Sequence, residues 1–413
     1  MRKEEVDVLI IGAGPSGAVS AGILAKNGIN FKIVEKEKFP RFVIGESLLP
    51  RSMEHFEEAG LLDDLMKQGF EKKIGARFLR GDDVCWFKFN EKFTPGWDWT
   101  WQVPRADFDK ALTDSLQKQG VKIDFETKVE KVTFHGTDSV SVISDKEGNL
   151  TEVHAKFIID ASGYGRFLPD REDLNIPSIL SPKTSMFVHV KDKNKPEGIE
   201  GPTITFDVLE LEHWFWMIPF SNGITSLGLV APSEYFQPTE NDNQEEVFRN
   251  IIKRSSYYKG RFDDVEFVFE PKKIIGYSKS VKKLYGDGYV LTGNSSEFLD
   301  PVFSSGVCFA TESGSTAAKL IARQLKGEKV NWEKDYAEHI AWGVDVFRSY
   351  ILDWYSGDLQ EFFFHKEENQ EVRRKVCSVL AGYVWDKENP FVLKHNRAVK
   401  AIANMIREEK KSK

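Results

Sequence analysis

The 413-residue chain has few cysteines and no excess of positive charge. Its three cysteines, Cys85, Cys308 and Cys377, stand far apart without a Cys-x-x-Cys pair, which argues against a disulfide framework and against a zinc site. The eight histidines have no paired spacing, so we expect no bound metal. Lysine and arginine total 57 against 64 aspartates and glutamates, a formal net charge of −7, so nucleic acid is not the expected partner.

Long apolar runs are also missing. No stretch of about 18 apolar residues is present to span a membrane, and the N-terminus has no apolar region of the signal-peptide kind. The composition, 41% hydrophobic and 29% charged, is that of a soluble globular protein. We therefore expect a cytoplasmic protein without a membrane span, and the length suggests two or three domains.

The first 36 residues carry the strongest motif. An apolar run leads into a Gly-x-Gly-x-x-Gly string, an alanine-rich helical pattern follows, and a second apolar run ends in an acid. This order predicts a strand, tight turn, helix and strand that bind a dinucleotide, with the pyrophosphate at the helix N-terminus and the acid on a ribose. An ordinary glycine-rich turn in an α/β unit is the alternative. The residues expected to contact the cofactor are Gly12, Gly14, Ser16, Gly17, Glu35 and Lys36.

The rest of the chain changes pattern twice. Residues 185–275 alternate apolar and polar positions between polar loops, which predicts an antiparallel sheet inserted as a substrate domain. The residues after 332 are mostly helical and amphipathic in pattern. Elsewhere the periodicity predicts helices at 51–67, 245–258 and 305–325, and strands at 70–78, 84–103, 121–126, 128–134, 139–144, 157–163 and 288–293.

Several strings together resemble the flavin-dependent halogenases, within the larger group of flavoproteins built like p-hydroxybenzoate hydroxylase. The resemblance covers roughly residues 5–325. Besides the glycine motif and its acid, the strings are Gly45-Glu-Ser-Leu-Leu-Pro50, the strand from Phe70 to Phe78, Trp214-Phe-Trp-Met-Ile-Pro219 and Asp300-Pro-Val-Phe-Ser-Ser-Gly306. The tryptophan string matches the WxWxIP signature of the halogenases position by position.

The resemblance implies FAD as cofactor and adds contacts far along the chain. A helix that starts at Ser305 would direct its N-terminus at the flavin, and the amides of Ser305 and Gly306 would also suit a chloride or bromide ion. Asn294 stands where relatives usually have Asp, which keeps an acceptor oxygen and loses the charge. The FAD contacts implied in this way are Ser47, Arg105, Val129, Asp160, Gly293, Asn294, Pro301, Ser305 and Gly306.

The resemblance also implies a catalytic lysine between flavin and substrate. In that family, reduced flavin, oxygen and halide yield a hypohalous acid, which a lysine captures or hydrogen-bonds and directs to one ring position. Lys73 matches this role, with Lys72 as the neighbour one position away and two solvated strand lysines as the plain alternative. Trp214, Trp216, Ile218 and Pro219 would shape the barrier between flavin and substrate, or belong to an ordinary core.

The implied fold class is α/β plus α+β. It comprises a Rossmann-type FAD-binding domain of the p-hydroxybenzoate hydroxylase type (residues 1–80, 104–184 and 276–328), an inserted antiparallel-sheet substrate domain (81–103 and 185–275) and a helical C-terminal region (329–413). The expected activity is halogenation of an aromatic or enolic small molecule, free or carrier-tethered. A separate flavin reductase is expected because no second Gly-x-Gly-x-x-Gly follows residue 17. The alternatives are a geranylgeranyl-type reductase, a flavin hydroxylase and a flavin-binding protein without activity.

Overall fold

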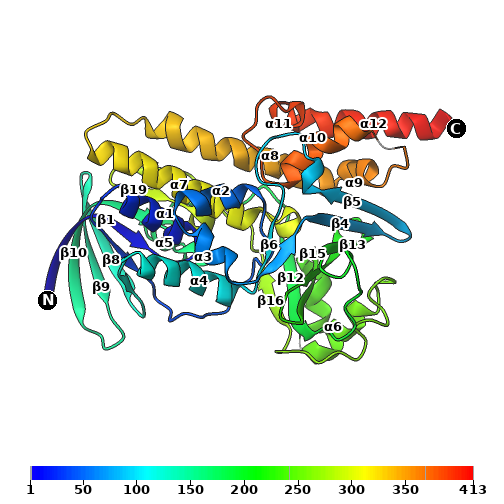
Figure 1. Ribbon diagram of the computed structural model, residues 1–413, viewed down its shortest axis with the longest axis horizontal. Coiled ribbons are helices and arrows are strands. Elements are labelled where there is room, and N and C mark those ends of the chain that lie inside the picture. The colour runs from blue at the N-terminus through cyan, green and yellow to red at the C-terminus, as the bar shows by residue number, and fades with distance from the viewer. Residues whose placement is uncertain (1, 241, 368, 413) are drawn as a thin grey trace.

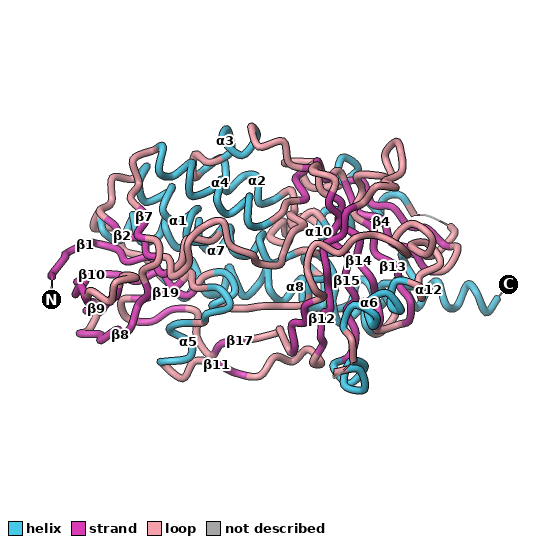
Figure 2. Tube along the Cα trace, turned by 90° about the horizontal axis from the view of Figure 1, so that it is seen from below, coloured by secondary structure: helices cyan, strands magenta, loops and turns pink. Residues whose placement is uncertain are grey.

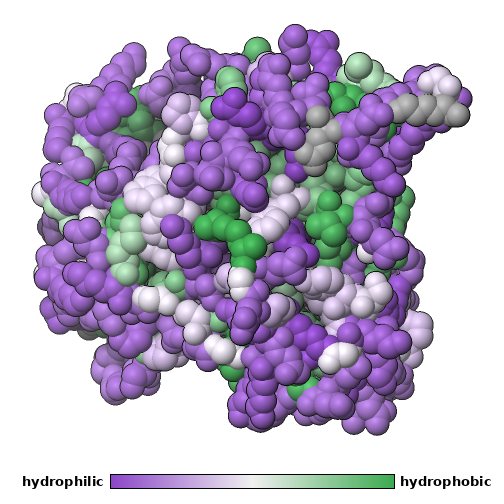
Figure 3. Space-filling model, turned by 45° about the vertical axis from the view of Figure 1, so that its right-hand side comes forward, coloured by the Kyte–Doolittle hydropathy of each residue, from purple (hydrophilic) through white to green (hydrophobic). Residues whose placement is uncertain are grey.

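The computed structural model describes residues 2–240, 242–367 and 369–412. Two large sheets lie at opposite ends of the molecule, and long helices run between and above them (Figure 1). The side of the surface seen in Figure 3 is mostly hydrophilic, with apolar side chains exposed in small separate areas. None of the helices in the described ranges is long and apolar enough to cross a membrane.

The first sheet is built around β1 (Arg2–Ile11), whose last residues Val8–Ile11 are buried apolar side chains. Parallel partners flank it on both sides, so these strands end at the same edge of the sheet. Beyond β10, the hairpin β8 (Lys128–His135) and β9 (Asp138–Ser144) continues the sheet. The strand order is β18 (Tyr285–Gly286), β19 (Tyr289–Leu291), β10 (Leu150–Asp160), β1, β2 (Phe31–Val34) and β7 (Ile123–Asp124).

Two helices with small residues pack tightly against each other beside this sheet. They are α1 (Pro15–Lys26), which follows β1, and α7 (Ser305–Leu325), nearly 300 residues later. A Cβ at Gly314 of α7 would lie 2.6 Å from the backbone oxygen of Ser16, and Ser20 Oγ donates to the Gly314 carbonyl at 3.1 Å. Helices α2 (Arg51–Glu58), α3 (Leu62–Met66) and α4 (Arg105–Lys118) surround this pair.

The second sheet has seven strands, antiparallel except where β13 runs parallel to β4. One face carries tryptophan and phenylalanine side chains of the main core. The other face has a separate core that includes Phe215, Met217 and Phe248, under η3 (Ser233–Thr239) and α6 (Gln244–Ile252). The strand order is β16 (Lys272–Ile275), β12 (Lys183–Lys191), β15 (Ile224–Pro232), β14 (His213–Pro219), β13 (Thr205–Glu210), β4 (Gly75–Arg80) and β5 (Asp83–Lys88).

The C-terminal part is helical, as its amphipathic pattern predicts. A π-helical turn, η6 (Glu333–Ala337), leads into the long helix α8, which packs against α7 and reaches across to the second sheet (Figures 1 and 2). The helices are α8 (Glu338–Tyr355), α9 (Asp358–Phe363), α10 (Gln370–Leu380), α11 (Pro390–Leu393) and α12 (His395–Ser412). The short remaining elements are β3 (Glu71–Lys73), β6 (Thr100–Gln102), β11 (Asn175–Ile176), β17 (Ser280–Val281), α5 (Phe167–Arg171), η1 (Phe89–Glu91), η2 (Gly163–Gly165), η4 (Gly293–Ser295) and η5 (Pro301–Phe303).

Several sequence-based predictions of secondary structure were wrong. The strand predicted at 84–103 is β5 and β6, which lie in different sheets with η1 between them. The single helix at 51–67 is two helices, because Gly60 between them takes a left-handed conformation with φ +74°. The single strand at 70–78 is two strands in different sheets, since β3 pairs with β6 and β4 joins the second sheet. Lys73 ends β3 and therefore does not share a strand face with Arg77. The helix predicted at 305–325 is confirmed as α7.

Candidate cofactor site and buried lysine

A cavity of about 640 Å³ lies between the two sheets. Its walls come from the carboxyl edge of the first sheet, the first turns of α1 and α7, the loop before α2, and the tryptophan face of the second sheet. In open α/β sheets this edge is where ligands bind. The predicted site residues that line it are Gly12, Gly14, Ser16, Glu35, Lys36, Ser47, Arg105, Val129, Trp214, Trp216, Ile218, Gly293, Asn294, Pro301, Ser305 and Gly306.

The turn between β1 and α1 needs its glycines for steric reasons. Gly12 has φ +101°, and a Cβ there would lie 2.5 Å from the Ala161 carbonyl oxygen. A Cβ at Gly17 would lie 1.9 Å from the Gly12 oxygen, so Gly17 serves packing and lies outside the cavity lining. At Gly14 a Cβ would instead extend into free space, with only Arg41 Nη2 nearby at 3.6 Å. No side chain caps α1, so its first N–H groups can bind an anion.

Glu35 is held in place at the end of β2. Its Oε2 accepts a hydrogen bond from the Ala13 N–H and its Oε1 from the Glu37 N–H, both at 3.0 Å. Each oxygen keeps a second lone pair for a ligand hydroxyl. Val129 and Lys36 line the cavity beside it. This arrangement suits the ribose and base of a bound nucleotide.

Two arginines share one buried carboxylate on the cavity wall. Arg105 Nε and Nη2 donate to the two oxygens of Asp109 at 2.9 and 3.0 Å, and Arg41 Nη1 donates to Oδ2 at 3.1 Å. Two guanidinium groups on one carboxylate leave a net positive charge beside Gly14, which suits a diphosphate. Sequence reasoning found Arg105 and missed Arg41, whose only local signal is its place in the Pro-rich loop after β2.

The start of α7 is built differently. Asp300 Oδ1 accepts from the Val302 N–H at 3.0 Å, a short turn follows, and Ser304 takes a left-handed conformation with φ +57° before α7 begins at Ser305. No side chain caps the helix, so N–H groups of its first turn border the cavity. A strained non-glycine residue at such a place is typical of functional sites.

The second sheet supplies an apolar wall. Trp216 lies over Gly228, where a Cβ would meet the indole ring at 2.2 Å, and its Nε1 donates to Ser226 Oγ at 3.1 Å. Trp214 and Ile218 complete this wall, while Pro219 lies outside it and accepts a hydrogen bond from Gln102 Nε2 at 2.6 Å through its carbonyl. These tryptophans belong to the core and border the cavity, which agrees with the core interpretation, and a role as the barrier between flavin and substrate stays a prediction.

Asp160 does not line the cavity. Its carboxylate is fully buried, and Oδ1 and Oδ2 accept from the N–H groups of Ser162 and Leu168 at 2.9 and 2.7 Å. Burial raises the pKa of this carboxyl group. Asp160 therefore supports the turn after β10, whereas Gly293 and Asn294 after β19 reach the cavity itself.

Lys73 is 2% exposed and lies outside the cavity lining. Its Nζ donates to the Leu48 carbonyl at 2.8 Å, and no carboxylate of the described residues pairs with it. Burial without a countercharge lowers the pKa of Lys73 to about 7. The neighbouring Lys72 is exposed, with Nζ 4.6 Å from the ring centre of Trp99. The interpretation of two solvated lysines is therefore correct for Lys72 and wrong for Lys73.

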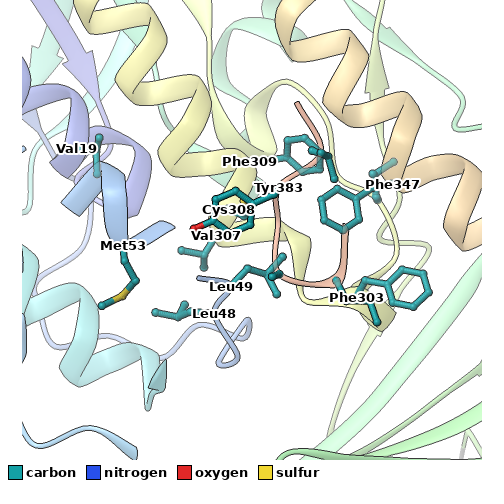
Figure 4. Close-up of a cluster of buried hydrophobic side chains, with 14 of the residues drawn as sticks. Val19, Leu48, Leu49, Met53, Phe303, Val307, Cys308, Phe309, Phe347 and Tyr383 are labelled. Carbon is teal, nitrogen blue, oxygen red and sulfur yellow. The ribbon is translucent and has the colours of Figure 1, made fainter. Parts of the chain in front are cut away.

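A buried apolar cluster lies next to Leu48, the residue whose carbonyl accepts the Lys73 hydrogen bond. Leu48 and Leu49, which directly follow the cavity-lining Ser47, lie beside Val307 of α7, with Phe303 and Phe347 beyond them (Figure 4). The backbone that receives the lysine hydrogen bond is therefore continuous with the cavity wall. Among the described residues, no group of three or more His, Cys, Asp and Glu side chains is arranged to hold a metal ion.

The cavity fits a bound dinucleotide that carries a planar ring, and FAD has this chemistry. The features that fit are the cavity volume, the uncapped N-termini of α1 and α7, the pair Arg41 and Arg105, and Glu35. The fold and the site thus define an FAD-dependent oxidoreductase. The family model for the FAD binding domain matches residues 5–341, and the chain belongs to this family and, within it, to the flavin-dependent halogenases.

Two curated relatives match almost the whole chain. The chain is 30% identical over 392 residues to a brominase of 1H-pyrrole-2-carbonyl-(peptidyl-carrier protein) from Pseudoalteromonas luteoviolacea, covering 92% of this chain and 93% of the relative. It is 29% identical over 425 residues to the corresponding chlorinase from Pseudomonas fluorescens, with 97% and 94% covered. The resemblance stated from the sequence motifs is thereby confirmed at the level of the family.

Two solved flavoprotein structures share the fold of almost the whole chain. A flavoprotein/dehydrogenase from Cytophaga hutchinsonii is 52% identical, with a TM-score of 0.96 over 98% of this chain and 100% of that one. The structure of a flavin-dependent brominase is 27% identical, with a TM-score of 0.83 over 99% and 100%. The mixed α/β fold with a Rossmann-type FAD domain is thus common to this chain and these flavoproteins.

Proposed function

We propose that this protein is a halogenase that uses reduced FAD, oxygen and a halide ion to halogenate an electron-rich aromatic or enolic ring. The observation that carries the proposal is Lys73, a lysine buried without a countercharge directly behind the wall of the cofactor cavity. Such perturbed groups concentrate at functional sites. When bound in its reduced form, FAD would supply two electrons to oxygen, and the oxygen reduced to the level of peroxide would oxidise the halide to hypohalous acid.

Lys73 has two chemically distinct roles open to it. As an ammonium group it donates a hydrogen bond to hypohalous acid. As a neutral amine it takes the halogen from hypohalous acid, whose oxygen leaves as water with one amine proton. The nitrogen–halogen bond then breaks as the halogen bonds to a ring carbon, and that carbon gives its proton back to the nitrogen. A pKa lowered to about 7 provides both forms at neutral pH. In either role a fixed lysine limits reaction to the carbon that the substrate presents to it.

The substrate side is proposed to be the second sheet with its flanking strands β4 and β5, and the cofactor side the first sheet with α1 and α7. Support comes from the tryptophan wall, which faces the cavity across from the glycine turn. The halide is proposed to bind at the first-turn amides of Ser305 and Gly306, supported by the absence of a side-chain cap on α7.

The substrate class is proposed to be an electron-rich ring tethered to a carrier protein. The support is that two relatives covering more than nine-tenths of this chain are named for pyrrole-carbonyl groups on a peptidyl carrier protein. Reduced flavin is proposed to come from a separate reductase, because the sequence has one dinucleotide motif and that motif serves the FAD site.

A trapping assay tests the proposal. Purified protein receives reduced FAD, oxygen, bromide and either a free phenol or a pyrrole-carbonyl thioester, and mass spectrometry detects the brominated product. We expect bromination by the wild type, loss of at least about 100-fold in Lys73→Ala, and little change in the matched variant Lys72→Ala. Equal activity of Lys73→Ala and the wild type, or oxygen insertion that needs no halide, would remove the halogenase proposal.

A further inference from the structure

A chain of buried and partly buried hydrogen bonds connects the end of helix α8 to the cofactor cavity. Trp214 Nε1 donates to Tyr355 Oη at 2.9 Å, and Tyr355 Oη donates to Asp300 Oδ2 at 2.9 Å. Tyr277 Oη donates to the same oxygen at 2.8 Å. Trp214, Tyr277 and Asp300 line the cavity, whereas Tyr355 lies behind them as the last residue of α8.

Asp300 determines the geometry of the turn before α7. Its other oxygen accepts the Val302 N–H, and two residues later Ser304 is in the left-handed region at φ +57°, ψ +27°. A non-glycine residue there is destabilised by about 1 kcal/mol or more and persists only when its surroundings hold it. The two tyrosine hydroxyls and the turn amide are the groups that hold Asp300.

The ring of Tyr355 also contacts a buried lysine. Its ring lies 4.7 Å from Nζ of Lys183, which is itself buried and pairs with Glu212 at 2.6 Å. Burial raises the pKa of both Tyr355 and Tyr277 well above the ordinary value for tyrosine. Both hydroxyls therefore keep their protons and act as donors to the carboxylate.

We propose that Tyr355 is a positioning residue through which α8 holds Asp300 and Trp214 in the arrangement that the flavin requires. The hydroxyl group connects the turn before α7 to the tryptophan wall of the second sheet, two parts of the site that are almost a hundred residues apart in sequence. This gives the C-terminal helical region a role in the cofactor site that no motif of that region indicates. The inference rests on the proposed placement of the α7 first turn against the flavin.

The test compares Tyr355→Phe with Tyr350→Phe. Tyr350 lies on the same helix, is more deeply buried than the half-buried Tyr355, and donates from its hydroxyl to the Phe391 carbonyl at 3.4 Å, away from Asp300. The readouts are the FAD dissociation constant by fluorescence titration, the absorption spectrum of bound FAD, and the thermal midpoint of the apoprotein.

We expect Tyr355→Phe to raise the FAD dissociation constant about tenfold, because a loop that has lost a charged hydrogen bond must be ordered on binding. Tyr350→Phe should stay within about twofold of the wild type. Tyr277→Phe, which removes the other donor to Asp300, should act in the same direction as Tyr355→Phe, and it decides the question if Tyr355→Phe does not fold.

Equal FAD affinity and an unchanged flavin spectrum in Tyr355→Phe would overturn the inference, as would a lowered apoprotein midpoint with intact FAD affinity. In addition, the yield of brominated phenol per reduced flavin should fall several-fold in Tyr355→Phe. A wild type that binds FAD and brominates nothing would remove the proposed function, and the comparison of FAD affinities would still decide the role of Tyr355.

Discussion

Helices α1 and α7 start at the same cavity, and their first turns are held in different ways. The turn before α1 is fixed by close backbone contacts, since a Cβ at Gly12 would collide with the Ala161 oxygen and a Cβ at Gly17 with the Gly12 oxygen. The turn before α7 contains a strained serine, Ser304, and is supported by hydroxyl groups from residues 277 and 355. One turn depends on glycines packed against backbone, and the other on side-chain hydrogen bonds, two of which come from distant parts of the chain.

The difference explains what each turn contributes. A glycine turn packed on backbone is rigid and serves the invariant part of a dinucleotide, its pyrophosphate. A turn held by side chains from other elements can be adjusted by substitutions far away, and it lies next to the place where the chemistry is proposed to occur. Substitutions at the two turns should therefore change stability and FAD binding to different extents. The following predictions are given in order of the size of the expected change.

The largest effect is expected from Gly17→Ala compared with Gly306→Ala. The first places a Cβ 1.9 Å from the Gly12 oxygen, whereas at Gly306 the nearest atom is Phe298 Cε2 at an ordinary 3.7 Å. We expect Gly17→Ala to lose more than about 5 kcal/mol of unfolding free energy and Gly306→Ala to stay within about 1 kcal/mol. Urea unfolding of the two apoproteins measures this. Equal losses would mean that both turns are locally determined.

The second prediction concerns Lys73, which lies outside both turns. Burial lowers its pKa to about 7, so between pH 7 and the ordinary lysine value the unfolded chain binds the additional proton. The free energy of unfolding should therefore rise with pH across this range, and the lysine should destabilise the fold most below pH 7. Lys73→Met should be more stable than the wild type at pH 7 by on the order of 4 kcal/mol, and this gain should shrink as the pH approaches 10.

Denaturant unfolding at pH 7 and pH 9.5 checks this prediction. Lys72→Met, which removes an exposed ammonium group, is the matched control for the loss of one positive charge. A gain in Lys73→Met that is the same at both pH values would contradict the idea that an uncompensated buried charge sits at this position. FAD binding should survive in both variants, since neither lysine lines the cavity.

The features of the site that depend on neighbouring residues could mostly be predicted from the sequence, and those that depend on pairs of distant residues could not. Local motifs gave the glycine turn, Glu35 and the start of α7 at Ser305, because steric need and helix periodicity act within a few residues. The tryptophan wall followed from alternation along one strand, since Trp214 and Trp216 do face the cavity.

The parts that sequence reasoning missed depend on pairs of distant residues. Arg41 matters because Asp109 on α4 binds it together with Arg105, and no local pattern reveals such a triad. The isolation of Lys73 depends on a strand that ends after three residues, which alternation across 70–78 concealed. The resemblance implied Asp160 as a cofactor contact, whereas the folded chain buries its carboxylate completely, away from the cavity lining, and holds it with two backbone amides.

The third prediction separates the stability of α8 from the hydroxyl of Tyr355. Asp353 on α8 is buried, with Lys400 Nζ at 3.8 Å, and burial raises its pKa to about 6. Ionisation of this group therefore destabilises the fold increasingly from about pH 4 to pH 6, and fully above that range. Asp353→Asn should raise the unfolding free energy by about 1 kcal/mol at pH 7.5 and by nothing at pH 4.

Chemical denaturation at the two pH values measures this gain. FAD affinity should not change in Asp353→Asn, because a more stable α8 still carries the same tyrosine hydroxyl. A variant that is more stable and also binds FAD several-fold more tightly would indicate that the rigidity of α8 as a whole, and not the single hydrogen bond, supports the turn before α7.

The smallest effect is expected at Asn294, beside the start of α7. The family resemblance implies Asp at this position, and Asn keeps one acceptor oxygen for the cofactor. The backbone carbonyl of Asn294 accepts from Arg166 Nη1 at 2.9 Å, so a cation already lies nearby and would offset an added negative charge. Asn294→Asp should change the FAD dissociation constant by less than about threefold and the unfolding free energy by less than about 0.5 kcal/mol. A fluorescence titration that found more than tenfold weaker FAD binding would mean that the α7 side of the cavity tolerates no added negative charge. The turn before α7 would then restrict substitution as strictly as the glycine turn at α1.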